Sequence, residues 1–379
     1  MRTLLACLFA IGVALPLQGL AQATTSPEAA QLIQALNLEA SPTPLQARED
    51  WQPRRVLVML LPSRGLASPD YVSELQAAAG DVELILDRSG KFIPEAEALE
   101  GVDGVIGFCS PPLLARADTT LRWVHNYSVG MEHCTGLSDE QAETLVFTNN
   151  QRLSAPAIAE HSIAMLLSIS RNLPAYHTAQ QAGEWRRELA DGVSFGELKD
   201  KTLLIAGLGG IGTEIARRAH GLGMRVIATR NSSRKGPDFV DYVGLADELP
   251  KLAAEADVVV NALPLTQETT ALFDKTLFES FKPGAIYISV GRGRSTVTAD
   301  LVAALQSGAL FGAGLDVTDP EPLPADSPLW GMPRVIITPH VSAAGRDSDR
   351  RSMLIAVENL RRYVAGEPLL NVVDIERGY

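Results

Sequence analysis

Three polar side chains follow apolar runs in the C-terminal third of the chain. Arg292 lies in SVGRG, Glu321 in LDVTDPEP and His340 in TPH, each after a run with the length and composition of a buried parallel strand. The carboxyl ends of parallel strands form the crevice in which open α/β sheets bind ligands. A guanidinium can hold a carboxylate and polarise a carbonyl, and an imidazole can protonate an oxygen that becomes an alkoxide. These residue types therefore suit hydride transfer to a 2-oxo acid.

Each of these residues also has a purely structural explanation. Arg292 could belong to a surface ion pair, Glu321 could be a turn residue between two prolines, and His340 could be a hydrogen-bonded core histidine. Their shared position at strand ends favours a chemical role for the three together. In that case Glu321 would accept a hydrogen bond from the imidazole, fix its orientation and favour its protonated form.

The stretch 203–230 predicts a binding site for the hydride donor. It reads LLIAGLGGIGTEIARRAHGLGMRVIATR, which is a strand, a glycine-rich turn, a helix and a second strand in dinucleotide-binding order. In this register Gly207 makes the tight turn, Gly209 lets the backbone approach the pyrophosphate, and Gly212 lets the helix pack on the strand. The N-terminus of the helix favours the anion. The cofactor-binding residues of this turn are Gly207, Gly209, Gly210, Ile211 and Gly212. The alternative is a glycine turn in an unrelated α/β fold.

The end of the second strand indicates which dinucleotide is preferred. An NAD site places Asp or Glu here to bind the ribose 2′-hydroxyl, whereas this chain has Arg230 followed by NSSRK. Guanidinium, hydroxyl and ammonium groups suit a 2′-phosphate. We therefore expect NADP (NADPH) to be preferred over NAD, with Arg230, Ser232 and Arg234 binding the phosphate. A solvated basic loop is the alternative.

Composition limits the other classes of function. The chain has 379 residues, 46% of them hydrophobic, and a formal net charge of −12 at pH 7. This length is enough for two domains, and the acidic balance disfavours a nucleic-acid partner. The six histidines are scattered without further ligands at metal spacing, so no metal site is expected. The expected partner is a small 2-oxo or 2-hydroxy acid.

The N-terminus resembles an export signal. Arg2 precedes an apolar run over 4–17, and the small-residue sequence AQA then predicts cleavage before Thr24. The run is too short for a stable membrane span. We expect a periplasmic or secreted protein. A buried N-terminal helix, or an inefficient signal that leaves the enzyme cytoplasmic, is the alternative. Only Cys109 and Cys134 remain after cleavage, and two cysteines predict no disulfide framework.

The rest of the chain alternates short apolar runs with helical patterns. Strands are expected from 55 onward and again after the glycine turn, and a long apolar helix is expected over 155–170. This alternation predicts an α/β protein with two doubly wound parallel sheets.

Five motifs together resemble one known family. They are GLGGIG, ALPLTQET, SVGRG, GLDVTDPEPLP and VIITPHVS, which occur in the order typical of the D-isomer-specific 2-hydroxyacid dehydrogenases, a family that includes glyoxylate/hydroxypyruvate reductases. The resemblance runs from about Arg55 to the C-terminus. Three features depart from the family pattern. Arg230 replaces the usual acidic residue, and Ser289 replaces the usual Asn, which leaves one strand-end hydrogen bond in question. The export signal is unusual for the family and bears on the physiological role more than on the chemistry.

The resemblance implies an arrangement of domains and a set of roles. A Rossmann cofactor domain is inserted into a flavodoxin-like substrate domain. The N-terminal residues themselves indicate a signal peptide at 1–23 and a linker at 24–53. The resemblance adds the first part of the substrate-binding domain at 54–152, the Rossmann domain at 153–342 and the C-terminal return at 343–379. Arg292, Glu321 and His340 form the catalytic set, and Arg292 also binds substrate. A homodimer is usual in the family.

The resemblance also assigns residues that spacing alone does not. The backbone N–H groups of Ser128, Val129 and Gly130 bind the substrate carboxylate. Asp316 faces the nicotinamide carboxamide, and Leu263, Pro264 and Gly291 line the cofactor. The sequence leaves one alternative function open, which is a non-catalytic NAD(P)-binding sensor or corepressor-like protein on the same fold.

Overall fold

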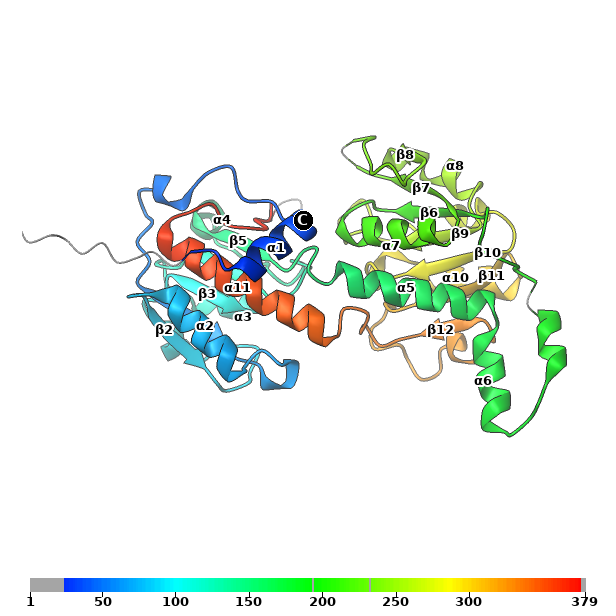
Figure 1. Ribbon diagram of the computed structural model, residues 1–379, viewed down its shortest axis with the longest axis horizontal. Helices are drawn as coiled ribbons and strands as arrows, with labels where there is room; N and C mark the ends of the chain where they lie inside the picture. The colour runs from blue at the N-terminus through cyan, green and yellow to red at the C-terminus, as the bar shows by residue number, and fades with distance from the viewer. Residues whose placement is uncertain (1–23, 193, 232, 376–379) are drawn as a thin grey trace, which may run out of the picture.

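The computed structural model describes residues 24–375 except 193 and 232. The predicted signal peptide and Ser232 lie outside the described residues. The described chain forms two α/β lobes that lie side by side (Figure 1). Each lobe contains one parallel sheet, as the alternation of strands and helices predicted.

The first lobe contains a five-stranded parallel sheet of order β2-β1-β3-β4-β5. Its strands are β1 (Arg55–Met59), β2 (Glu83–Asp87), β3 (Gly104–Gly107), β4 (Trp123–Asn126) and β5 (Val146–Asn149). The helices between them are α2 (Pro69–Ala79), α3 (Pro111–Arg116) and α4 (Asp139–Thr144). This is the doubly wound order of flavodoxin, which confirms the predicted class of the substrate domain.

The second lobe contains a seven-stranded parallel sheet of order β12-β11-β10-β9-β6-β7-β8. Its strands are β6 (Thr202–Ala206), β7 (Arg225–Thr229), β8 (Tyr242–Gly244), β9 (Val258–Asn261), β10 (Ala285–Ser289), β11 (Leu310–Leu315) and β12 (Val335–Ile337). Its helices include α7 (Gly210–Gly221), α8 (Leu249–Ala253), α9 (Lys275–Glu279) and α10 (Thr298–Gln306). The order reverses between β6 and β9, which makes a Rossmann sheet with its switch point beside the glycine turn.

Two segments connect the lobes. The chain enters the second lobe through α5 (Ala155–Ser170), which packs on α7, and returns through α11 (Arg346–Ala365), which packs on α2 of the first lobe (Figure 1). Tyr363 of α11 is buried in the first core, and its ring stacks on Trp123 with the ring centroids 4.7 Å apart. The second lobe is therefore inserted into the first.

The segment expected to be a linker is packed on the first lobe. Its helix α1 (Pro27–Ala35) begins at Ser26, whose hydroxyl accepts a hydrogen bond from the Ala29 N–H, and it contacts α11. This N-terminal capping follows the sequence, because Ser at the cap and Pro in the first turn are both favoured.

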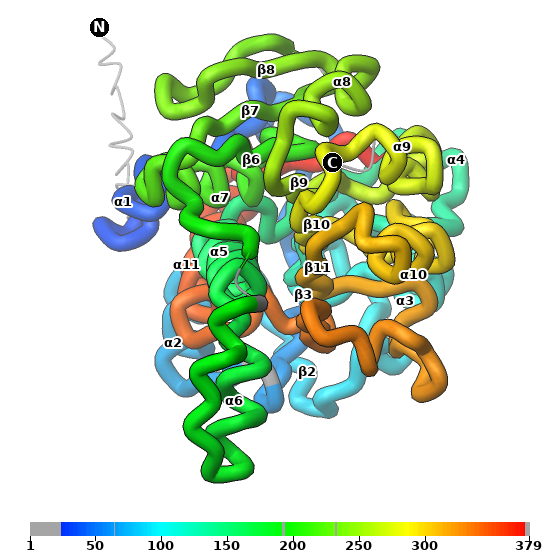
Figure 2. Tube along the Cα trace, turned by 90° about the vertical axis from the view of Figure 1, so that its right-hand side faces the viewer, coloured from blue at the N-terminus to red at the C-terminus, as the bar shows by residue number. Residues whose placement is uncertain are grey.

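One feature of the second lobe was not predicted. After α5, a helical arm of α6 (Leu173–Gln181) and the turn over Arg187–Gly192 projects from the body of the molecule (Figure 2). Trp185 between them is 88% exposed and Leu173 is 49% exposed.

Among the helices of the described residues, none is both long and apolar enough to cross a bilayer.

Candidate active site

The glycine turn has the geometry that a bound pyrophosphate requires. Gly207 has a φ of 97°, which favours glycine, and a side chain at Gly212 would overlap the carbonyl oxygen of Gly207. By contrast, a Cβ at Gly209 would meet nothing within 4 Å. The space in front of Gly209 is open, and the first N–H groups of α7 begin there. These residues therefore fit a dinucleotide phosphate.

The ends of β6, β9 and β10 meet beside this turn. Leu263 lies near Gly207 and Gly291. A Cβ on Gly207 would fall 3.1 Å from the side chain of Leu263, and a Cβ on Gly291 would fall 2.6 Å from the Leu263 carbonyl oxygen. Pro264 is held through its carbonyl oxygen, which accepts a hydrogen bond of 2.7 Å from Thr269. The structure thus brings together these three predicted cofactor contacts.

Ser289 keeps the strand-end hydrogen bond that its departure from the family pattern left in question. The buried Asn261 amide at the end of β9 donates to the Ser289 hydroxyl over 3.2 Å and to the Ser295 hydroxyl over 2.7 Å. The hydroxyl of Ser289 therefore serves as an acceptor for the same amide that holds Ser295, in the turn that follows Arg292.

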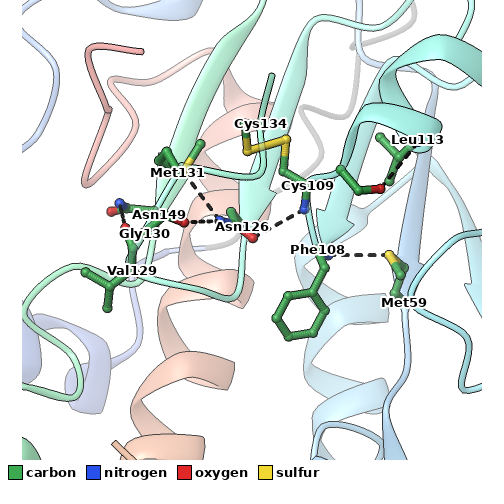
Figure 3. The surroundings of a disulfide bond; sticks show 11 residues. Met59, Phe108, Cys109, Leu113, Asn126, Val129, Gly130, Met131, Cys134 and Asn149 are labelled. Atoms are coloured by element: carbon green, nitrogen blue, oxygen red, sulfur yellow. Dashed lines mark hydrogen bonds between the residues drawn. A yellow bond between two sulfur atoms is a disulfide. The ribbon is translucent and has the colours of Figure 1, made fainter. Parts of the chain in front are cut away.

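The loop over 128–130 is held by its carbonyl oxygens. The Val129 oxygen accepts from the Asn149 amide at 2.6 Å, and the Gly130 oxygen accepts from the Asn126 amide at 3.0 Å (Figure 3). The Ser128 oxygen accepts from a backbone N–H at 3.2 Å. Within the described part of the chain, the N–H groups of these three residues donate no hydrogen bond. Anchored oxygens and three unpaired N–H groups suit a carboxylate.

A disulfide between Cys109 and Cys134 ties this loop to the end of β3 (Figure 3). The expectation that the two cysteines form no disulfide framework was therefore incomplete, because the strand ends bring residues 25 positions apart in sequence together. The Asn126 side chain links the same two segments, since its oxygen accepts from the Cys109 N–H at 3.3 Å. The bond joins the predicted substrate loop to the body of the first sheet.

We expect reduction of this disulfide to weaken both stability and substrate binding. Closing a loop of this length stabilises a folded chain by about 3 kcal/mol, so dithiothreitol should lower the free energy of unfolding by that order. The KM for the substrate should rise while the Kd for the dinucleotide stays constant. A variant carrying Cys109→Ser and Cys134→Ser should show the same changes without reductant and no response to it. Unchanged stability in that variant would contradict the prediction.

Arg292 extends from the second lobe to the loop of the first. Its Nε donates to a Glu132 carboxylate oxygen at 2.7 Å, and its Nη1 donates to the Gly291 oxygen at 2.8 Å. A side chain on Gly130 would overlap Nη2 of Arg292. The predicted cation and the predicted carboxylate-binding loop therefore meet in the structure.

His340 and Glu321 form the pair that the sequence predicted. The Nδ1 atom of His340 lies 2.7 Å from a Glu321 carboxylate oxygen. A carboxylate only accepts, so Nδ1 carries the proton and Nε2 is the ring nitrogen left for substrate. Both side chains are open to solvent, at 44% and 41% exposure. Arg292 and His340 follow β10 and β12, which are two strand spacings, about 10 Å, apart at the backbone.

Asp316, at the end of β11, holds the backbone beside His340. One carboxylate oxygen accepts from the Thr338 hydroxyl and the Val341 N–H, and the other accepts from the Ser342 N–H, at 2.7–3.0 Å. Burial alone would raise the pKa of Asp316, but the hydrogen bonds from Ser342, Thr338 and Val341 lower it below its ordinary value. Contact with the nicotinamide carboxamide stays a prediction for this residue.

Asp316→Asn is expected to lower the free energy of unfolding by about 1–3 kcal/mol, because the amide nitrogen would face an N–H donor. It should also reduce kcat by loosening the His340 backbone. Because the folded-state pKa is lowered, the carboxylate adds stability above about pH 4 that is lost as the pH falls through that pKa. The difference between variant and wild type should therefore shrink in acid. Denaturant titrations at several pH values, with exposed Asp326→Asn as the control, would measure this, and a constant difference would contradict it.

The basic residues that follow β7 form hydrogen bonds and an ion pair with neighbouring groups. The Arg230 Nη1 donates to the Lys235 backbone oxygen at 3.0 Å, whereas the Arg234 guanidinium is held by the Tyr242 hydroxyl at 2.9 Å and by Glu248 at 2.6 Å. Arg230 follows the strand directly. It is therefore the residue of this cluster that is better placed for a ribose phosphate.

Sequence reasoning missed several residues that build the site. Asn126 and Asn149 hold the loop predicted to bind substrate, and Glu132 pairs with Arg292. Asparagines at the ends of two neighbouring apolar runs were the available signal, because strand ends of a parallel sheet share one edge. His161 forms a hydrogen bond of 2.9 Å with the Thr338 hydroxyl and so joins α5 to the end of β12.

The fold and the site define a two-domain, dinucleotide-dependent oxidoreductase. A family model described as "D-isomer specific 2-hydroxyacid dehydrogenase, NAD binding domain" matches residues 163–342. A glyoxylate/hydroxypyruvate reductase B from Escherichia fergusonii is 32% identical over 74% of this chain and 86% of its own length. The chain belongs to the D-isomer-specific 2-hydroxyacid dehydrogenase family, as its motifs predicted.

Solved structures agree with this assignment. A D-isomer specific 2-hydroxyacid dehydrogenase from Xanthobacter autotrophicus, crystallised with NADPH and MES, is similar with a TM-score of 0.69 and 30% identity over 86% of this chain and 99% of that one. An NADPH-dependent glyoxylate/hydroxypyruvate reductase from Sinorhizobium meliloti, in complex with NADP and sulfate, has a TM-score of 0.68 and 29% identity over 86% of this chain and 100% of that one.

Proposed function

We propose that the protein reduces a small 2-oxo acid, of the glyoxylate or hydroxypyruvate kind, to the D-2-hydroxy acid with NADPH. The observation that carries this proposal is the meeting of the Arg292 guanidinium with the loop over 128–130, whose oxygens are anchored and whose N–H groups are unpaired. A carboxylate with an adjacent carbonyl matches that arrangement. The names of the E. fergusonii and S. meliloti relatives support the same substrate class.

The reaction needs three contributions from this chain. The loop amides bind the carboxylate of the substrate, and Arg292 stabilises the negative charge that grows on the carbonyl oxygen. His340, oriented through its hydrogen bond to Glu321, donates the proton to that oxygen. The reduced nicotinamide supplies the hydride when it is bound. The open face of Gly209 and the start of α7 would hold its pyrophosphate.

The preference for NADPH rests on the end of β7. Arg230 stands where an NAD site would have a carboxylate, and it can offer a planar set of donors to a 2′-phosphate. The two NADP-bound relatives support the preference. NAD is the alternative cofactor.

One assay tests substrate and cofactor together. The purified protein is mixed with a panel of 2-oxo acids and either NADPH or NADH, and loss of absorbance at the nicotinamide band is followed. We expect turnover with small 2-oxo acids and a higher kcat/KM with NADPH. Equal efficiency with NADH would contradict the cofactor preference, and no turnover with any 2-oxo acid would contradict the reductase. A sensor without turnover is the alternative, and the retained Arg292, Glu321 and His340 weigh against it.

We also propose that the protein is a homodimer formed around the cofactor lobe. The projecting arm that begins with α6 exposes Leu173 and Trp185, and burying these apolar side chains against a second copy would stabilise a dimer. Trp185→Glu should shift the mass measured by light scattering from two chains to one. Leu222→Glu, which changes an exposed leucine on the body of the lobe, should leave the mass unchanged. A wild-type protein of single-chain mass would contradict the dimer.

We propose further that the chain is exported. The predicted signal peptide supports this, and the disulfide between Cys109 and Cys134 fits an oxidising compartment. N-terminal sequencing of protein from separated cell fractions tests it. The exported fraction should begin at Thr24, and an uncleaved cytoplasmic protein would contradict the proposal.

A further inference from the structure

Glu132 and Arg292 form an ion pair that crosses between the two lobes. Glu132 follows β4 of the first lobe, and Arg292 follows β10 of the second. The Nε of Arg292 lies 2.7 Å from a Glu132 oxygen, and the side chains of Arg292 and Glu132 are 25% and 31% exposed. Charge-assisted hydrogen bonds at this distance fix geometry more firmly than exposed pairs do.

The contacts of the guanidinium leave one edge for the substrate. Nε is taken by Glu132 and Nη1 by the Gly291 backbone oxygen. Nη2 and the second carboxylate oxygen of Glu132 both lie against Gly130, since a side chain on that glycine would overlap both. The arginine therefore turns Nη2 toward the loop whose N–H groups are unpaired.

The backbone that carries Glu132 is itself fixed. The Gly130 oxygen before it is held by the Asn126 amide, and Cys134 after it is joined to Cys109. The N–H of Cys134 donates to the Met131 oxygen at 2.8 Å. A carboxylate on so restrained a loop can serve as a fixed reference for the arginine of the other lobe. Burial acts to raise the pKa of Glu132, but Arg292 overcomes it and the pKa is lowered, so the group is ionised at neutral pH.

We propose that Glu132 is a positioning residue that holds Arg292 by its Nε edge, so that Nη2 faces the 2-oxo acid bound at the loop and can stabilise the negative charge that grows on its carbonyl oxygen. The proposal rests on the proposed reductase function. Because the partners belong to different lobes, the same ion pair aligns the arginine only when the lobes are in the relative position seen here. Glu132 thereby couples the relative position of the two lobes to the orientation of Arg292 in the site.

Substitutions of Glu132 that change the length or the charge of its side chain test this role. Glu132→Ala removes the acceptor, and Glu132→Asp shortens the side chain by one methylene. We expect both to lower kcat/KM roughly a hundredfold, the effect expected for a reacting group displaced by about 1 Å. Glu132→Gln keeps an acceptor oxygen at the same reach and should recover most of kcat. The dinucleotide Kd and the melting temperature should stay close to wild type, and Glu140→Ala on the exposed face of α4 is the matched control.

A double-variant cycle separates positioning from a general loss of structure. In an Arg292→Ala background, adding Glu132→Ala should cost little further activity, because the residue that it positions is gone. Additive losses would overturn the proposal. A fall in KM for Glu132→Ala would also overturn it, since the carboxylate would then be competing with the substrate. Absence of 2-oxo acid reduction in the wild type would instead refute the proposed function itself.

Discussion

His340→Ala is expected to lower kcat for 2-oxo acid reduction by roughly 10²–10⁴-fold, which is the range that a positioned general acid contributes. The dinucleotide Kd should change little, because the glycine turn of the cofactor site lies at the β6 end of the sheet and His340 follows β12. Steady-state rates with a saturating small 2-oxo acid, together with fluorescence titration of NADPH, would measure both quantities.

Two further variants test the assignment of the proton donor. His177→Ala changes an exposed histidine on α6 and should leave kcat unchanged. Glu321→Gln keeps an acceptor for Nδ1 but removes the charge, so it should lower kcat less than His340→Ala does. A His340→Ala enzyme with wild-type kcat would refute the role of the imidazole.

Arg292→Ala is expected to lower kcat/KM by roughly 10²–10³-fold, the effect of removing one donor from a site that stabilises an oxyanion. Both parameters should change, since in the proposed reaction the guanidinium contacts the bound substrate and stabilises the developing charge. Arg292→Lys should recover only part of the activity, because an ammonium lacks the planar fork. Arg294→Ala, two residues along the same turn and exposed, is the control. Wild-type kcat/KM in Arg292→Ala would contradict the assignment.

The class of fold could be predicted because its signals are local. Apolar runs predicted the strands of both sheets, and the long apolar stretch over 155–170 predicted the helix α5 that the structure contains. The glycine turn was also predictable, since Gly207 and Gly212 each stand where backbone conformation or close packing excludes other residues. The short strand β8 gives no such signal, because three residues carry too little periodicity.

The completed site depends on distant contacts that spacing does not encode. Glu132 and Arg292 are 160 positions apart in sequence, and only the packing of two lobes brings them together. Likewise, the sequence provided two cysteines but no sign that their strand ends are neighbours. The pairing of His340 with Glu321 was predictable because both follow neighbouring strands of one sheet.

The return of α11 to the first lobe affects the order in which the chain can fold during synthesis. The core of that lobe includes Leu360 and Tyr363, which a ribosome makes more than two hundred residues after β5. Until they emerge, the nascent first lobe lacks one layer over its sheet and exposes apolar surface. For an exported chain this delay is useful, because secretion machinery needs an unfolded polypeptide. The inserted topology would keep the N-terminal lobe incompletely folded, and therefore able to pass through a secretion channel, until α11 is made.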